Sequence, residues 1–336
     1  MKLSELLPHL LHSFSSESDL VRAIEEISHK FTKERESIGD YLNDPRLVSA
    51  YAAFYLTTNM PKLEAVTQWL NTEEREALKG FDLIDVGAGP GTFSLAWREL
   101  FGTKSAMIET SKLMREQAVK FYQGLYQEEA LFKPELLGEK KILLFGHSLN
   151  EMGVEAGLEY IKKYNPEKIW LLEPGTKQSF ALALSLRKKL IDLHWKVRFP
   201  CLSQGECPMS QTDDWCHQYL NVRHDPEVER LTQLASRDRR HLPMTVMMFE
   251  RDYQQRETHG RIVRVFPQTK FSHEWQICFQ RNNELQLVRV EVPFRQFSKS
   301  QIKAVAAFLS GHEIQFEVLK ELQEKLRIAL HFDLIE

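Results

Sequence analysis

The spacing of apolar residues predicts that the first part of the chain is helical. Over the first 78 residues, apolar side chains recur every three or four positions, as at Leu20, Ile24, Ile27 and Phe31. This is the period of a helix that buries one face. The segment 51–61 is apolar and aromatic through most of its length. We therefore expect a further, buried helix there.

From residue 81 onward the pattern changes to short apolar runs separated by helix-like segments. The runs cover 81–87, 105–109, 141–146 and 168–175. Alternation of this kind is typical of α/β proteins, in which helices pack on a parallel, doubly wound sheet. We therefore predict an α/β fold with a Rossmann-like core.

The pattern changes again after residue 194. Residues 195–224 hold three of the four cysteines and show no clean period, and 225–241 return to a helical pattern. Strand-like runs follow, and 300–330 has the pattern of one or two amphipathic helices. We expect four parts: an N-terminal helical region (1–78), a Rossmann-like core (79–194), a cysteine-rich segment (195–241), and C-terminal strands that complete the sheet, followed by helices (242–336).

Composition narrows the class of protein without identifying it. Hydrophobic residues make up 43% and charged residues 27% of the 336 positions, which is ordinary for a globular protein and excludes wholesale disorder. No apolar run reaches the roughly 18 residues of a membrane-spanning helix, so we expect no membrane association. The formal net charge is −3. Nucleic-acid binding would therefore need a local basic patch, such as 237–264, where seven arginines stand against four acidic residues.

The start of the chain gives an expectation about the compartment. It lacks the long apolar stretch of a secretory signal and the arginine-rich pattern of a transit peptide. We therefore expect a bacterial cytoplasm, where cysteines are more often reduced thiols or metal ligands than disulfides.

A glycine-rich loop is the sharpest local signal. It reads Asp85-Val-Gly87-Ala88-Gly89-Pro-Gly91, and it lies between a predicted strand and a predicted helix. Glycines at alternate positions let the backbone turn tightly and approach a ligand closely. Glu109 ends the next predicted strand, where a carboxylate can accept hydrogen bonds from both hydroxyls of a ribose. Strand, loop and carboxylates together predict a site for a nucleoside-containing ligand.

The spacing of the glycines differs from that of a dinucleotide site, which prefers G-x-G-x-x-G. It resembles motif I of class I S-adenosylmethionine methyltransferases. A catalytic motif does not accompany it: no Asn/Asp-Pro-Pro-Tyr follows the fourth strand and no cysteine lies near the loop. Residues 147–151, Ser148 among them, could line the methyl end of the pocket or form a capped loop. We therefore assign no catalytic residue.

The cysteines form the second candidate site. Cys201, Cys207 and Cys216 lie within sixteen residues, and Cys278 is on a predicted strand. The chain has no Cys-x-x-Cys pair, so a common zinc ribbon does not fit. Widely spaced thiolates with one remote ligand suit an iron–sulfur cluster better. A four-thiolate zinc site and incidental thiols remain as alternatives.

Together, the sequences DVGAGPGT, LLEPGTKQSF, C-x5-C-P and WCH resemble the ribosomal small-subunit methyltransferase-like family of bacteria and mitochondria. The resemblance covers roughly residues 40–292. It implies a class I methyltransferase fold that binds S-adenosylmethionine. It also implies a [4Fe-4S] cluster on the four cysteines, and association with the small ribosomal subunit and its rRNA.

Three functions follow from this resemblance and from the residues. We expect an rRNA methyltransferase; the alternatives are a non-catalytic assembly factor that keeps the cofactor fold and a zinc-stapled methyltransferase of small molecules. The mixed charge of the C-terminal stretch departs from the basic tail expected of bacterial relatives. The sequence does not indicate an oligomeric state.

Overall fold

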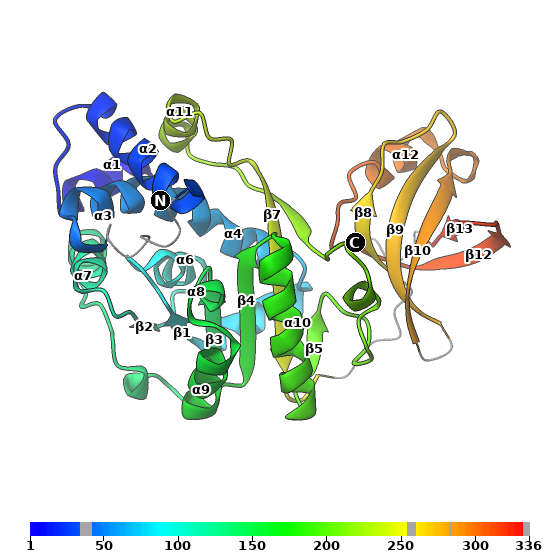
Figure 1. Ribbon diagram of the computed structural model, residues 1–336, viewed down its shortest axis with the longest axis horizontal. Helices are drawn as coiled ribbons and strands as arrows, with labels where there is room; N and C mark the ends of the chain where they lie inside the picture. Colours follow the sequence, from blue (N-terminus) through cyan, green and yellow to red (C-terminus); the bar gives the residue numbers. More distant parts are fainter. Residues whose placement is uncertain (34–41, 254–259, 282–283, 332–336) are drawn as a thin grey trace. The chain divides into compact units, whose positions relative to one another are not determined.

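The computed structural model describes residues 1–33, 42–253, 260–281 and 284–331 (Figure 1). The chain divides into two compact units. The first comprises Met1–Ser148, Tyr164–Pro166 and Leu220–Leu242, and the second comprises Leu149–Lys163, Glu167–Tyr219 and Pro243–Glu336. No helix in the described ranges is both long enough and apolar enough to span a bilayer.

The first unit begins with the predicted helices. These are α1 (Leu3–Leu6), α2 (Glu17–Lys33), α3 (Pro45–Tyr51), the π-helical turn η3 (Ala52–Leu56), α4 (Thr57–Thr67) and α5 (Thr72–Ala77). Asp44 caps α3 by accepting hydrogen bonds from two backbone N–H groups, and Asn71 forms a capping box with Glu74 at α5. All of η3 and most of α4 is buried, so the predicted buried helix at 51–61 is confirmed.

A parallel sheet follows in the same unit. Strand β1 (Asp82–Val86) lies between β2 (Ser105–Ile108) and β3 (Lys141–Gly146), and it is parallel to both. Helices α6 (Thr92–Phe101) and α7 (Lys112–Tyr126) connect or follow these strands, and α11 (Pro226–Leu234) belongs to the same unit. The carboxyl ends of parallel strands meet at one edge of a sheet. The glycine loop, Glu109 and Ser148 therefore share that edge.

The second unit continues the alternation of helix and strand. It contains α8 (Leu149–Met152), α9 (Val154–Tyr164), β4 (Lys168–Pro174), α10 (Lys177–Asp192) and β5 (Lys196–Phe199). The short strand β6 (Gln218–Asn221) precedes α11. Strand β7 (His241–Glu250) runs antiparallel to both β4 and β5. The fold is α/β, as predicted, with parallel and antiparallel strand pairs.

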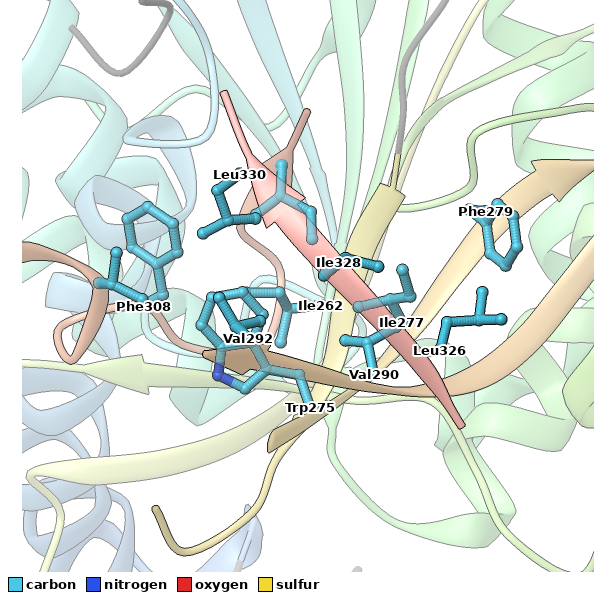
Figure 2. Packing of buried hydrophobic residues seen from close by; sticks show 12 residues of the cluster. Ile262, Trp275, Ile277, Phe279, Val290, Val292, Phe308, Leu326, Ile328 and Leu330 are labelled. Carbon is cyan, nitrogen blue, oxygen red and sulfur yellow. The ribbon is translucent and has the colours of Figure 1, made fainter. Parts of the chain in front are cut away.

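The C-terminal strands form a second sheet, which differs from the expectation that they complete the first. Its order is β11 (Glu313–Ile314), β8 (Gly260–Val265), β9 (Ser272–Arg281), β10 (Glu284–Pro293), β13 (Leu326–Leu330) and β12 (Phe316–Glu321). Its core holds Trp275, Ile277, Val290 and Ile328, seen in Figure 2. Of the expected strands, only β7 pairs with β4 and β5.

The segment 300–330 also departs from the helical expectation. Helix α12 (Lys299–Val305) is short, and β11, β12 and β13 follow it. Gly311 adopts φ +98°, a left-handed conformation in which a helix does not continue. Beyond it, Leu326, Ile328 and Leu330 are buried at every second position, which is the period of a strand.

Candidate functional site

The glycine loop has the conformation that its sequence predicts. Gly87, Gly89 and Gly91 all have positive φ, at 71°, 57° and 88°. A Cβ on Gly87 would lie 2.5 Å from the Cβ of Ser148, closer than real side chains approach. The N–H groups of Gly87 and Ala88 donate to the Ile108 carbonyl at 2.8 and 3.2 Å, so the loop is fastened to the end of β2.

Asp85 is the last residue but one of β1, just before this loop, and is almost completely buried. Its Oδ2 accepts hydrogen bonds from the Ser94 backbone N–H and hydroxyl, both at 3.0 Å, which caps the first turn of α6. Its Oδ1 has no hydrogen-bond partner within the described part of the chain. Burial raises the pKa of Asp85 to about 7, against the lowering effect of Ser94, and the charge of Glu109 raises it further.

Glu109 lies directly after β2 and joins the loop to the next helix. Its Oε2 accepts from the Gly89 N–H at 2.8 Å and its Oε1 from the Ser111 N–H at 2.7 Å. The Ser148 hydroxyl donates to the Val86 carbonyl at 2.5 Å. The structure therefore brings the predicted loop residues, Glu109 and Ser148 to one edge of the sheet.

A buried lysine–histidine pair lies beside the same strand ends and was not predicted. His147 adopts φ +61°, and its ring stacks on Phe93 with 4° between the ring planes. Its Nε2 lies 2.9 Å from Nζ of Lys62, which is only 2% exposed. Burial lowers the pKa of His147 well below its usual value, and the charges of Lys62 and Arg239 act in the same direction. The neutral imidazole therefore accepts a hydrogen bond from the ammonium. A lysine within an apolar helical segment is the signal that could have indicated this pair.

The surroundings of the loop are aromatic and basic. Tyr51 approaches the position of a Cβ on Gly89 to 4.0 Å. Arg239, from the predicted basic patch, lies over the Tyr55 ring at 5.1 Å, whereas Arg240 of that patch pairs with Asp238. Residues 256 and 257 of the patch lie outside the described residues. A separate cavity of about 730 Å³ lies along α7 and does not include the glycine loop.

The cysteines form a cluster in the second unit. Cys201 follows β5, Cys207 begins a 3₁₀ turn (Pro208–Gln211), Cys216 precedes β6 and Cys278 is on β9. All four are free thiols. The last three pack on one apolar patch formed by Phe180, Met209 and Val263. Cys278, which is remote in the chain, therefore packs on the same patch as Cys207 and Cys216.

Burial dominates the electrostatics of these thiols. It raises the pKa of Cys207 to about 11, and it raises the pKa values of Cys216 and Cys278 well above their usual range. Cys201 and Cys207 both raise the pKa of Cys278 further, so these sulfurs are close enough to interact electrostatically. A bound metal would have to supply the free energy of deprotonating them.

Two buried arginines flank the cysteines. Arg187 donates to the carbonyls of Ser203 and Gly205 at 3.1 and 2.7 Å, and Arg261 donates through Nε to the Pro200 carbonyl at 2.8 Å. They thereby fix the backbone on both sides of Cys201. Both guanidinium groups lower the pKa of Cys278, because they favour a negative charge there.

The described residues contain no group of three or more His, Cys, Asp or Glu side chains placed to hold one metal ion. The four cysteines are partly buried free thiols. An all-thiol donor set is of the type that ligates either an iron–sulfur cluster or a four-thiolate zinc ion. The metal centre itself stays a prediction.

Comparison with protein families identifies the group to which the chain belongs. The model of one family, described as mitochondrial small ribosomal subunit Rsm22, matches residues 46–283. The chain belongs to the Rsm22 family. The match includes the glycine loop and all four cysteines, and it confirms the family resemblance predicted from the motifs. The family's description names mitochondria and does not support the expectation of a bacterial cytoplasm. That expectation stays a prediction.

Solved structures resemble this Rsm22-family protein only weakly. Magnesium protoporphyrin IX methyltransferase from Synechocystis PCC 6803 is 13% identical, with 68% of this chain and 97% of that chain covered and a TM-score of 0.36. Mitomycin 7-O-methyltransferase is 13% identical, with 68% and 67% covered and a TM-score of 0.35. A methyltransferase from Thiobacillus denitrificans is 14% identical, with 57% and 96% covered and a TM-score of 0.27. These scores are too low to carry an argument. No curated protein matches the chain.

Proposed function

We propose that this Rsm22-family protein is methyltransferase-like, binds S-adenosylmethionine at the glycine loop, and acts on the small ribosomal subunit by methylating rRNA, by assisting assembly, or both. The observation that carries the proposal is the loop itself. Three left-handed glycines follow β1, with the buried carboxyl group of Asp85 and the partly buried one of Glu109 beside them. The family's description supplies the small ribosomal subunit as partner.

The residues that would hold the cofactor are Asp85, Gly87, Ala88, Gly89, Gly91, Glu109 and Ser148. The unpartnered Oδ1 of Asp85 marks a polar position that a ligand would satisfy. Each Glu109 oxygen accepts one backbone N–H and keeps a second lone pair, which suits the hydroxyls of a ribose. When bound, the cofactor supplies an activated methyl group. The carboxylates offer its sulfonium charge a favourable field.

We propose that the four cysteines hold a [4Fe-4S] cluster. Three of the thiols come from the 201–216 segment and the fourth comes from β9, so a cluster would link that segment to β9. Arg187 and Arg261 would offset the negative charge of the thiolates and position Cys201 through its neighbouring carbonyls. Zinc in the same place is the alternative.

A non-catalytic assembly role is favoured by the hydrogen bonds of two polar residues, one just after β3 and one near the end of β4. The Ser148 hydroxyl bonds the Val86 carbonyl, and the buried Glu173 carboxylate accepts from the Leu149 N–H at 2.8 Å. Both side chains are hydrogen-bonded to backbone groups, so neither is positioned to act as a general base. In this alternative, the cofactor stabilises a surface that docks on rRNA.

Transfer of tritium from labelled S-adenosylmethionine into small-subunit precursors tests the enzymatic reading. We expect label in the rRNA with the parent chain and none with Asp85→Asn. Absence of label, with cofactor binding and subunit association intact, supports the assembly factor. Absence of cofactor binding by calorimetry overturns the proposed loop site.

Anaerobic purification with metal analysis tests the cluster. We expect a brown protein with broad absorbance near roughly 400 nm, typical of thiolate-ligated iron. Cys207→Ser should remove the colour, whereas Ser210→Ala, in the same segment, should keep it. A colourless protein with stoichiometric zinc would replace the cluster by the zinc alternative.

A further inference from the structure

The C-terminal sheet carries an unusual distribution of charge at one end. No acidic residue lies between Gly260 and His273, and none lies between Val292 and His312, although the whole chain is net acidic. The exposed cations of these two stretches are Lys270, Arg295, Lys299 and Lys303. None of the four has an ion-pair partner among the residues that the structure describes.

The two stretches meet in the structure. The Phe294 N–H donates to the Phe271 carbonyl at 2.8 Å, which joins the β8–β9 turn to the segment before α12. The His273 ring packs edge-on against Phe294 at 4.8 Å, and the Ile302 backbone in α12 is close enough to raise the pKa of His273, against the larger lowering effect of burial. Lys299 and Lys303 flank Ile302 along that helix. The cations therefore gather around one turn.

An aromatic ring projects from this turn. Phe271 is 71% exposed, a larger fraction than that of the other exposed large hydrophobic side chains of the described residues. The turn beneath it is rigid, because the Thr269 hydroxyl accepts from the N–H groups of Phe271 and Ser272 and the Thr269 N–H donates to the Ser272 carbonyl. The Lys270 ammonium lies 5.6 Å from the centre of the Phe271 ring. A rigid turn thus holds an apolar ring in solvent beside a cation.

We propose that this end of the C-terminal sheet binds single-stranded RNA, with Phe271 stacking on an unpaired base and Lys270, Arg295 and Lys299 contacting phosphates. Aromatic rings beside a basic track are the common means of binding unpaired nucleotides, because every base offers a stacking face. The nearby carboxylate of Glu274 does not oppose a polyanion, since Arg289 and Lys325 pair with it. This inference rests on the proposed action on the small ribosomal subunit and adds to it a defined contact surface.

Fluorescence anisotropy of the full chain, with a labelled RNA of about twelve nucleotides containing only adenine and cytosine, tests the surface. We expect Phe271→Ala to weaken binding by about tenfold and Phe271→Trp to preserve it. Leu136→Ala, which truncates a 60% exposed side chain in the other unit, should change nothing. A self-complementary duplex should compete poorly.

The salt dependence tests the cations separately. Neutralising Lys270, Arg295 and Lys299 together to glutamine should reduce the slope of log affinity against log salt by about two, at about 0.7 per phosphate contact. Lys320→Gln, on the far edge strand β12, should leave the slope unchanged. Binding by Phe271→Ala within twofold of the parent, or an unchanged slope in the triple variant, would overturn the proposal.

Cosedimentation with small ribosomal subunits separates this proposal from the proposed function. If the parent chain binds subunits and Phe271→Ala binds both subunits and RNA equally well, the surface is refuted and the function stands. If the parent chain binds neither, both fail. If Phe271→Ala loses subunits while the parent binds no isolated RNA, the surface recognises protein, which also refutes the proposal.

Discussion

Replacing Gly87 by alanine should destabilise the protein through two separable effects. At φ +71° an alanine costs about 1–2 kcal/mol relative to its preferred backbone conformation. The new Cβ would also lie 2.5 Å from the Ser148 Cβ, and relieving such overpacking costs about 1–3 kcal/mol. We therefore expect the free energy of unfolding to fall by roughly 2–5 kcal/mol.

Gly102 provides the matched control. It has nearly the same φ, +69°, lies in the same unit, and has no atom within 4 Å of the position that a Cβ would take. Gly102→Ala should therefore cost only the backbone part, about 1–2 kcal/mol. Urea denaturation followed by circular dichroism measures both values, provided that the slope with denaturant is unchanged.

Removing the opposing side chain isolates the steric part. Ser148→Gly in the Gly87→Ala background should recover about 1–3 kcal/mol, seen as a coupling energy in a double-mutant cycle. Equal destabilisation by Gly87→Ala and Gly102→Ala, or no coupling to Ser148, would refute the claim that the loop is packed against the β3 end.

Three further changes test other parts of the structure. The folded-state pKa of Asp85, about 7, lies above its ordinary value of 3.8, so its stabilising contribution is present at low pH and is lost as pH rises towards 7. Between pH 5 and 8 the parent should lose roughly 3 kcal/mol of unfolding free energy that Asp85→Asn retains; parallel pH profiles would contradict this. For the proposed cluster, Arg187→Met should weaken iron retention by about 10–100-fold, seen as faster loss to a chelator, whereas Lys188→Met, at an exposed neighbouring residue, should not; equal rates of iron loss would refute the role of Arg187. Ile328→Ala should cost about 2–5 kcal/mol in thermal or urea unfolding, against under about 0.5 for the half-exposed Leu319→Ala, and a small effect at 328 would contradict the burial of β13.

Much of what could be predicted from the sequence depends on patterns among residues that are adjacent in the chain. The glycine loop could be located from sequence because its conformation depends on residues that are adjacent in the chain. The same is true of the continuous apolar run that forms β1. The strand ends then place Glu109 and Ser148 beside the loop, because parallel strands share an edge.

Long-range contacts could not be predicted in the same way. No periodicity links Arg187 to the carbonyls around Cys201, or Lys62 to His147, since each pair joins segments far apart in the chain. The helical prediction for 300–330 was wrong for a different reason. Ile302, Val305 and Phe308 have helical spacing, and the change to alternate burial comes only after Gly311.

The network around Glu109 has a kinetic consequence. The loop's N–H groups are already bonded to β2 and to this carboxylate within the folded chain. A small molecule arriving there meets a preorganised backbone and does not have to order it. Its rate of capture is then set by diffusion rather than by a slow rearrangement of the loop.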